Sequence, residues 1–410
     1  MVNLELFISE FITKRPISLF EADLEANREL LGREIRGKSV MVIGGAGTIG
    51  SSYIRALLRF EPARLYVVDT SENGLTELTR DLRSTAGMKV PEVYRTYPLD
   101  FGDPLFGRIF RNEGPFDIVA NFAAHKHVRS EKDAYSVAAL LRNNVIKARG
   151  LLNLLSEAPP KHFFCVSTDK AANPVNIMGA SKKLMEELIM AYAGRFPVTT
   201  ARFANVAFSA GSLPDGWLNR LAKHQPLSAP SDVKRYFVSP EESGHICLMA
   251  CILGQSGDIF FPRLEESQMM TFSEIGINLL RHLGYEPVVC GSEEEAKRTA
   301  DGGQRTAERI IDGGHGLYPI YLFASDTSGE KAFEEFFTEG EAVDLERFTS
   351  LGVIKNAPIR PIEEVGRVVD ELIGLLERPD LDKAAVVNAL SAMLPGFSHI
   401  ETGKSLDGRM

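Results

Sequence analysis

The sequence predicts an α/β protein built on a doubly wound parallel sheet, and three observations support this fold class. Short apolar runs alternate with segments of helical periodicity from Ser39 to Phe203, which is typical of parallel strands joined by crossover helices. The first run, Ser39–Ile43, leads into a glycine-rich turn and then a helix. After Asn205 prolines become frequent, so we expect a smaller C-terminal α/β region there.

The composition is that of an ordinary globular protein and excludes several classes of function. The chain has 410 residues, enough for two or three domains. Its net charge of −9 argues against a nucleic-acid-binding surface. The 4 cysteines lack metal-binding spacing, so we expect reduced core residues of a cytoplasmic protein. No apolar run approaches the roughly 20 residues of a membrane-spanning helix, and no membrane contact is expected.

The chain is expected to divide into four regions. Residues 1–37 repeat apolar side chains at helical spacing, and we interpret them as an N-terminal helical arm that either packs on the main domain or contacts another subunit. Residues 38–205 form the dinucleotide-binding domain. Residues 206–360 form the substrate-binding region, which is interleaved with that domain. Residues 361–410 are C-terminal helices and a tail, which we expect to be loose from Pro395 onward.

A glycine-rich turn after the first strand predicts a dinucleotide site. Gly44, Gly47 and Gly50 form a GxxGxxG pattern between the strand and a helix. Glycine lets the backbone turn tightly and approach a pyrophosphate, and the amides of a helix N-terminus bind the anion. We expect Thr48 and Ile49, in the same turn, to contribute to this site. A tight turn without a ligand is the alternative.

The second strand ends at Asp69, which is about where a carboxylate would hold a ribose 2′-hydroxyl. This position favours NAD over NADP, although Arg80 and Arg83 keep NADP open as the less favoured cofactor. Asp100 could meet the adenine amine, with a plain turn aspartate as the alternative. The other expected cofactor contacts lie at or after strand ends, and they are Ser71, Asn73, Phe101, Ala123, Ala124 and Asn205.

A basic loop follows the fourth apolar strand. It runs from His125 to Arg129 and lies at the switch point where a substrate would enter a doubly wound sheet. We therefore predict that His125, Lys126 and His127 bind substrate, with Lys126 and Arg129 neutralising a diphosphate. A solvated basic loop is the alternative. No metal site is expected, because the two histidines have no third ligand nearby.

The strongest chemical signal follows the fifth strand. Thr168, Asp169 and Lys170 come directly after a buried apolar run, and Lys182 lies four residues beyond Met178 on the next helix. Ligands of open parallel sheets bind at the carboxyl ends of the strands. A carboxyl group, a hydroxyl and two amines gathered there predict acid–base chemistry. The alternative is that Asp169 and Lys170 form a simple surface ion pair.

These motifs resemble the extended short-chain dehydrogenase/reductase superfamily, and more narrowly its polysaccharide-biosynthesis nucleotide-sugar 4,6-dehydratases. The matching segments are Gly44–Ser51, Asn121–Val128, Ser167–Pro174, Met178–Lys182, Arg202–Asn205 and Arg235–Phe237. The resemblance implies a Rossmann-type sheet, bound NAD, a nucleotide-sugar substrate and a homo-oligomer. Ser325–Phe336 resembles the C-terminal region of the soluble enzymes of legionaminic-acid-type pathways, which implies UDP- or GDP-N-acetylglucosamine as substrate.

The resemblance also implies a mechanism. Carbon 4 of the sugar is oxidised, water leaves across carbons 5 and 6, and carbon 6 is then reduced. Asp169 protonates the departing 6-hydroxyl and Lys170 removes the carbon 5 proton. Thr168 holds the 4-oxygen, while Lys182 holds the nicotinamide ribose. Further substrate contacts are implied for Asn173, Asn205 and Arg235.

One position departs from the superfamily pattern. A tyrosine usually stands where this chain has Met178, and a thioether has no proton to exchange. Some dehydratases of this group resemble the chain in having methionine there, so we do not interpret the site as inactive. The base for the 4-hydroxyl stays unassigned, and Met178 packing in its helix is the structural alternative.

Two other functions stay open. One is a nucleotide-sugar epimerase or oxidoreductase of the same superfamily, which needs the cofactor but no acid–base pair for dehydration. The other is a dinucleotide-binding protein without turnover. The sequence does not determine which nucleotide the substrate carries, or whether the configuration at carbon 5 is retained or inverted.

Overall fold

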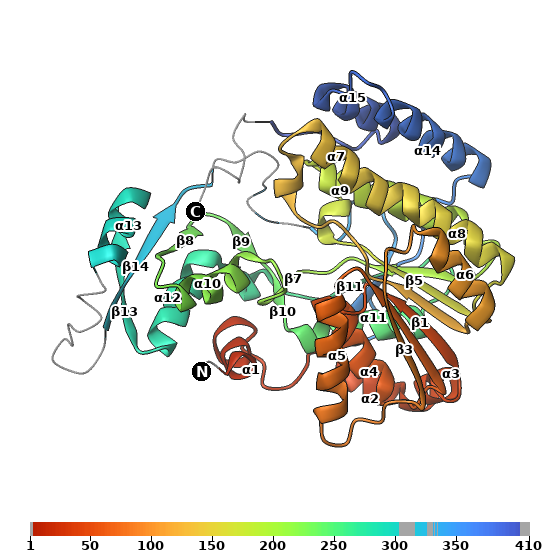
Figure 1. The fold of residues 1–410 in the computed structure, drawn as a ribbon, viewed down its shortest axis with the longest axis horizontal. Helices are drawn as coiled ribbons and strands as arrows, with labels where there is room; N and C mark the ends of the chain where they lie inside the picture. The colour runs from red at the N-terminus through yellow and green to blue at the C-terminus, as the bar shows by residue number, and fades with distance from the viewer. Residues whose placement is uncertain (1–2, 303–315, 326–330, 332, 334, 402–410) are drawn as a thin grey trace.

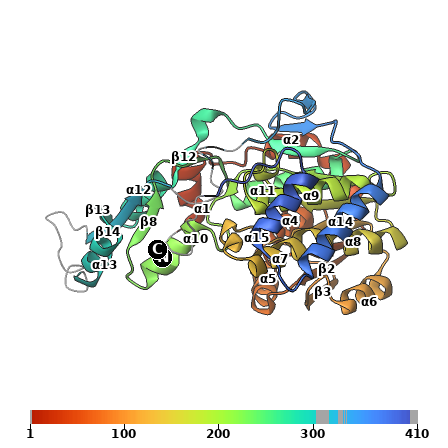
Figure 2. The ribbon, with the colours of Figure 1, turned by 90° about the horizontal axis from the view of Figure 1, so that it is seen from above.

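A large and a small α/β lobe lie side by side in the computed structural model, which describes residues 3–302, 316–325, 331, 333 and 335–401 (Figures 1 and 2). The large lobe holds the main sheet. The small lobe is formed by chain from the second half of the sequence, joined by the start of the N-terminal arm.

The large lobe is organised around a nine-stranded sheet within the described residues, in the order β3-β2-β1-β4-β5-β6-β11-β16-β15. The run from β3 to β11 is parallel, and β16 and β15 add antiparallel strands at one edge. The prediction of a Rossmann-type doubly wound parallel sheet is therefore confirmed. The strands are β1 Ser39–Ile43, β2 Arg64–Asp69, β3 Val93–Pro98, β4 Ile118–Asn121, β5 His162–Val166, β6 Val198–Ala201, β11 Ile259–Pro262, β15 Val343–Asp344 and β16 Leu351–Ile354.

The central strands are apolar because helices cover both faces of the sheet. Every residue of β1, β4 and β6 is buried. One face packs on α4 and α11, and the other on α8 and α9, over which the C-terminal helices form an outer layer (Figures 1 and 2). The helices of this lobe are α4 Thr48–Leu58, α5 Glu72–Ser84, α6 Pro104–Glu113, α7 Ala134–Leu141, α8 Lys147–Glu157, α9 Ile177–Ala191 and α11 Pro240–Leu253.

The small lobe has its own apolar core around the fully buried Trp217, whose indole N–H donates to the Ser228 carbonyl at 2.9 Å. Its three-stranded sheet is parallel, and two short ladders lie beside it within the described residues. The elements are β7 Asn205–Val206, β8 Leu227–Pro230, β9 Lys234–Arg235, β10 Phe237–Val238, β12 Met270–Thr271, β13 Tyr285–Cys290, β14 Gly316–Phe323, α10 Leu213–Ala222, α12 Phe272–His282 and α13 Glu293–Gly302.

The N-terminal arm contacts both lobes of its own chain. Phe7, Ile8 and Ile12 are buried in the core of the small lobe, whereas α2 (Glu21–Ala26) and α3 (Arg28–Ile35) pack on the large one. The first interpretation of the arm, packing on the main domain, therefore describes only its second half. The reason is that α1 (Leu4–Phe7) and the π-helical turn after it pack their apolar faces into the core of the small lobe. No pattern in the sequence indicates that core.

The C-terminal region forms α14 (Ile362–Leu376) and α15 (Lys383–Met393). The expectation of a loose end is wrong for residues 395–401, because Phe397 is buried and the amide of Ile400 donates to the carbonyl of Val175 at 3.0 Å. Residues 402–410 lie outside the described part of the chain. Among the helices that the structure describes, none is both long and apolar enough to cross a bilayer.

Candidate functional site

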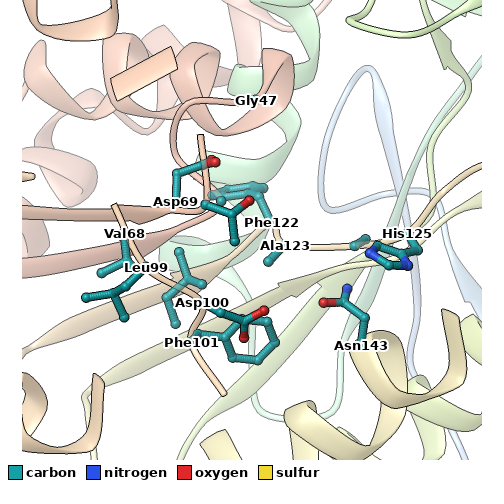
Figure 3. Close-up of a pocket in the computed structure, with 14 residues that line it drawn as sticks. Gly47, Val68, Asp69, Leu99, Asp100, Phe101, Phe122, Ala123, His125 and Asn143 are labelled. Carbon is teal, nitrogen blue, oxygen red and sulfur yellow. The ribbon is translucent and has the colours of Figure 1, made fainter. Parts of the chain in front are cut away.

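A pocket of about 240 Å³ lies at the carboxyl ends of β1 to β4 (Figure 3). This is the edge where an open parallel sheet binds ligands. The pocket brings together half of the residues that the sequence predicts for the cofactor, namely Gly44, Gly47, Asp69, Asp100, Phe101, Ala123 and Ala124. It also includes His125, which the sequence assigned to the substrate.

The three glycines of the turn are required for different structural reasons. Gly44 has φ of +75°, and a Cβ there would lie 2.5 Å from the amide nitrogen of Ala123. A Cβ on Gly50 would lie 2.3 Å from the Gly44 carbonyl oxygen. For Gly47 the nearest such atom is 3.5 Å away, an ordinary contact. Packing within the protein therefore requires glycine at positions 44 and 50. At position 47 the protein has room for a side chain, but that side chain would occupy the pocket.

Asp69 presents a fixed carboxylate to the pocket. Its Oδ2 accepts a hydrogen bond from the amide of Ala46 at 3.0 Å, and its Oδ1 accepts one from the amide of Ser71 at 2.9 Å. Each carboxylate oxygen has a second lone pair for another donor. The arrangement can thus hold a hydroxyl group without first reorienting the side chain.

The remaining predicted cofactor residues lie outside this pocket. The Ser71 hydroxyl caps α5 by accepting from the amide of Gly74 at 3.1 Å, and Asn73 is exposed on that helix. The Thr48 hydroxyl accepts from the amide of Ala210 at 2.9 Å, which joins the glycine turn to a loop near the small lobe. Ile49 packs partly buried against the core.

Lys147, on α8, is a pocket neighbour that the sequence analysis missed. Its ammonium pairs with Asp100, whose other oxygen accepts from the amide of Gly102 at 2.7 Å. Burial alone would raise the pKa of Asp100, but Lys147 and this amide lower it below the usual range. Burial lowers the pKa of His125, and Lys147 adds to that effect, so His125 is neutral at pH 7.

The acid–base cluster lies at the end of β5, outside the residues that line the pocket. Oδ1 of Asp169 accepts hydrogen bonds from the Thr168 hydroxyl at 2.8 Å, the Lys170 amide at 2.9 Å and the Lys170 ammonium at 3.2 Å. Asp169 is only 4% exposed. The pair is therefore not the surface ion pair of the alternative interpretation.

Lys182 and Met178 are both buried on α9. The Lys182 ammonium donates to the carbonyl of Val166, the last residue of β5, at 2.9 Å. Burial lowers its pKa, which Cys165 and Glu186 partly offset. The backbone amide of Met178 donates to the Glu131 carboxylate at 2.9 Å. The methionine thus occupies a packed position at the first turn of the helix.

Asn144 connects the pocket to this helix. It lies in a π-helical turn, Arg142–Ile146, and its amide nitrogen donates to the His125 carbonyl at 2.9 Å and to the Ser181 hydroxyl at 3.0 Å. Its oxygen accepts from the amide of His125 at 2.8 Å. Such π turns occur frequently at functional sites. The signal available in the sequence was a pair of asparagines, Asn143 and Asn144, at buried positions of a helical segment.

The predicted substrate residues are spread along the junction of the lobes. The Lys126 ammonium donates to the Ser209 hydroxyl at 3.3 Å, and surrounding protein lowers the pKa of Lys126 although its surface stays open to solvent. Burial likewise lowers the pKa of His127, as do Lys126 and other nearby cations. Both residues are exposed, and the environment that lowers their pKa values lies at the junction of the lobes.

Three other predicted substrate residues contact the protein itself. The exposed Asn173 donates to the Glu335 carboxylate at 2.7 Å. Arg235 is 4% exposed, and its guanidinium donates to the carbonyls of Lys234 at 2.9 Å and Lys331 at 3.0 Å. Asn205 lies in the β7–β10 ladder that leads to the small lobe. None of the three lines the pocket.

Comparisons with known proteins place these features in a family. The model of a family described as polysaccharide biosynthesis protein matches residues 40–313. A Methanocaldococcus jannaschii protein named as an uncharacterized membrane protein is 30% identical over 326 residues, covering 78% of this chain and 86% of its own length.

Two relatives have named activities. A UDP-N-acetylglucosamine 4,6-dehydratase (inverting) of Campylobacter jejuni is 27% identical over 238 residues, or 56% of this chain and 67% of that enzyme. A UDP-glucose 4-epimerase of Rickettsia felis is 27% identical over 324 residues, or 74% of this chain and 87% of that enzyme.

A solved structure agrees with the fold. It is a dTDP-glucose 4,6-dehydratase of Streptomyces venezuelae with NAD bound, with a TM-score of 0.54 and 19% identity over 81% of this chain and 97% of that one. At this identity the match shows the arrangement of the elements only.

Proposed function

We propose, from the premise that the chain belongs to the polysaccharide biosynthesis protein family, that it is an NAD-dependent nucleotide-sugar 4,6-dehydratase. Its substrate would be UDP- or GDP-N-acetylglucosamine, and its 4-keto-6-deoxy product would supply surface polysaccharide, glycan or nonulosonic acid synthesis. The observation that carries the proposal is the hydrogen-bonded cluster of Thr168, Lys170 and the buried Asp169 at the carboxyl end of β5. The Campylobacter jejuni relative named as a dehydratase of this kind supports it.

The pocket fits a dinucleotide. Gly44 and Gly50 bring backbone together so closely that no side chain fits, and Gly47 leaves room for a pyrophosphate at the start of α4. The anchored Asp69 carboxylate suits a ribose 2′-hydroxyl and would repel a 2′-phosphate, so NAD is favoured over NADP. When bound, NAD supplies reversible oxidation of the sugar, while the protein supplies orientation and proton transfer.

The cluster provides an acid and a base on adjacent residues. In the proposed reaction Asp169 protonates the departing 6-hydroxyl, and Lys170 removes the proton on carbon 5. The Thr168 hydroxyl, which donates to Asp169 at 2.8 Å, would exchange that partner for the sugar 4-oxygen. The Lys182 ammonium, fixed at the Val166 carbonyl, would supply positive charge near the nicotinamide ribose.

The junction of the lobes around Lys126 is the proposed entrance for the nucleotide sugar. Lys126 is suited to a diphosphate because its exposed ammonium lies at this junction, where it contacts Ser209. His127 stands beside it and His125 faces the cofactor pocket. Asn173, Asn205 and Arg235 stay predicted substrate contacts, and assembly into a homo-oligomer stays a prediction.

The experiment that tests the proposal is incubation with NAD and either UDP- or GDP-N-acetylglucosamine, followed by mass spectrometry and proton NMR. The proposal predicts loss of one water and a 4-keto-6-deoxy sugar. A product of unchanged mass with altered configuration would identify an epimerase, which the Rickettsia felis relative keeps as the second candidate. NAD binding with no change in either sugar nucleotide or in CDP- and dTDP-sugars would instead favour a protein without turnover.

A further inference from the structure

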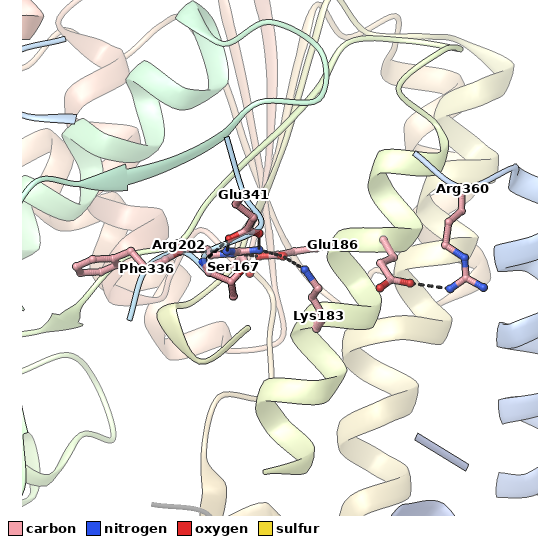
Figure 4. Close-up of polar contacts among 9 residues, drawn as sticks. Ser167, Lys183, Glu186, Arg202, Phe336, Glu341 and Arg360 are labelled. Atoms are coloured by element: carbon pink, nitrogen blue, oxygen red, sulfur yellow. Dashed lines mark hydrogen bonds and ion pairs between the residues drawn. The ribbon is translucent and has the colours of Figure 1, made fainter. Parts of the chain in front are cut away.

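Residues 335–341, between β14 and β15, pack on the large lobe and contact Arg202 and Asn173, the latter three residues after the acid–base cluster. Phe336 is buried against Phe261, with ring centroids 6.1 Å apart, and its carbonyl accepts from Arg202 at 3.1 Å. The Glu341 carboxylate accepts from both terminal nitrogens of Arg202, at 3.0 and 2.9 Å (Figure 4). One oxygen of that carboxylate also accepts from the amide of Thr338 at 2.8 Å. Residues 335–341 are called the brace below.

Arg202 carries this contact into the core of the lobe. It follows β6, is fully buried, and donates to Glu186 of α9 through Nε at 2.9 Å and Nη2 at 2.8 Å (Figure 4). Burial alone would lower the pKa of Arg202, but its two carboxylate partners raise it. Burial alone would raise the pKa of Glu186, but Arg202 lowers it. Arg202 and Glu186 are therefore both charged at neutral pH.

Glu186 in turn holds the residue that precedes the cluster. Its Oε1 accepts from the Ser167 hydroxyl at 2.6 Å, and Ser167 is followed directly by Thr168. The chain of contacts thus runs from Glu341 through Arg202 and Glu186 to the first residue before the acid–base turn. At the far end of that turn, Glu335 of the brace accepts from Asn173 at 2.7 Å.

Such a network is a costly way to stabilise a fold. A buried ion pair often adds little net stability compared with apolar side chains of the same shape, because both charges lose their water. What bidentate guanidinium–carboxylate pairs provide is a fixed geometry. A reaction that depends on an acid and a base at set positions benefits from that geometry.

We propose that Glu341 is a positioning residue, which acts through Arg202 and Glu186 to hold Ser167 and so places Thr168, Asp169 and Lys170 for the reaction. The proposal deepens the dehydratase assignment and rests on it. Glu341 does not touch the pocket, so its removal affects the rate of the chemical step and leaves binding of the substrate and cofactor nearly unchanged.

The test compares Glu341→Gln with Glu187→Gln in the full-length protein. Glu187 is the next residue on α9 after Glu186, but its partly buried carboxylate accepts from Arg360 at 2.8 Å and not from Arg202. Both substitutions remove one paired carboxylate, and only the first is connected to Ser167. Arg202→Lys serves as a second variant, because it keeps the charge but cannot bind two carboxylates in the same fork geometry.

Steady-state kinetics and hydrogen exchange of the peptide covering residues 167–173 are measured for each variant. We expect kcat of Glu341→Gln to fall about tenfold to a hundredfold, with KM within about twofold and faster exchange in this peptide. Arg202→Lys should change both readouts in the same direction. Glu187→Gln should match the wild type in both.

Two results would overturn the inference. One is a kcat for Glu341→Gln equal to that of Glu187→Gln, and the other is unchanged exchange of residues 167–173. If the wild type fails to convert any nucleotide sugar, the proposed function is wrong, and the exchange measurement alone still decides whether the brace holds the turn.

Discussion

The cofactor pocket and the acid–base cluster are held in place in different ways. The pocket is built from neighbouring turns at the ends of β1 to β4, with glycines that the backbone requires and a carboxylate fixed by nearby amides. The residues near the cluster are instead contacted from distant parts of the chain, since Glu335, Glu341 and Ile400 bind Asn173, Arg202 and Val175. From this difference we expect that dinucleotide binding is specified locally, whereas the placement of the proposed acid and base depends on the C-terminal third of the chain.

The largest effect is expected from Asp169→Asn, because this substitution should abolish catalysis at the cluster and leave binding at the pocket unchanged. Removal of a general acid typically lowers a rate by about 10² to 10⁴, so product formation should nearly cease. Calorimetric titration should show NAD and nucleotide-sugar binding close to wild type, since Asp169 does not line the pocket. Product formation at a near wild-type rate would remove Asp169 from the mechanism.

Two glycine variants should break the pocket in different ways. Gly47→Ala should fold normally and bind NAD about tenfold more weakly, because a methyl group there meets the ligand rather than the protein. Gly44→Ala is the matched comparison and should lower the melting temperature, because its Cβ would overlap the backbone of Ala123. Equal NAD affinity of Gly47→Ala and wild type, measured by titration, would mean that the pyrophosphate binds elsewhere.

A further pair of substitutions tests the cluster. Met178→Ala should retain far more activity than Lys182→Ala, because the thioether exchanges no proton, whereas the ammonium supplies charge near the reacting groups. Loss of the buried methionine side chain should still cost about 2–5 kcal/mol of folding free energy, visible in a denaturant titration. If kcat collapses equally in both variants, the methionine is positioned for the chemistry and not only packed.

The smallest effect concerns pH dependence of the pocket. Burial and Lys147 lower the pKa of His125 below its ordinary 6.5, so this group should stay mostly neutral from pH 8 down to 6.5, and NAD affinity should change little over that range. Lys147→Gln should move the titration upward, toward the ordinary value. The NMR shifts of the His125 ring protons followed against pH would measure this, and an unchanged titration midpoint in the variant would contradict the assigned role of Lys147.

Local patterns in the sequence were sufficient for the sheet and for most of the pocket. The run Ser39–Ile43 was predicted with the bounds that β1 has. An apolar run that ends at a glycine turn indicates a strand without information from the rest of the chain. Asp69 and Asp100 line the pocket because Asp69 is the last residue of β2 and Asp100 lies just beyond β3. Ser71 and Asn73 do not line it, because Ser71 caps α5 and Asn73 lies on the exposed first turn of that helix.

The contacts around the cluster could not be predicted in the same way. Arg202 and Glu341 are separated by 139 positions, and neither has a local pattern that indicates its partner. The packing of Phe397 and the pairing of Ile400 with Val175 depend likewise on the completed large lobe. Residues 326–330, 332 and 334 of the resembling segment Ser325–Phe336 lie outside the described part of the chain, and Glu335 and Phe336 at its end contact Asn173 and Arg202.

The most direct measurement of the central claim is the reaction of UDP- or GDP-N-acetylglucosamine with NAD in deuterated water, followed by NMR of the product. If Lys170 and Asp169 carry out an elimination, the product lacks one water and contains solvent deuterium at carbon 5, because the proton returned there comes from exchangeable groups. A converted sugar that keeps its oxygen at carbon 6 and its original hydrogen at carbon 5 would contradict the assignment.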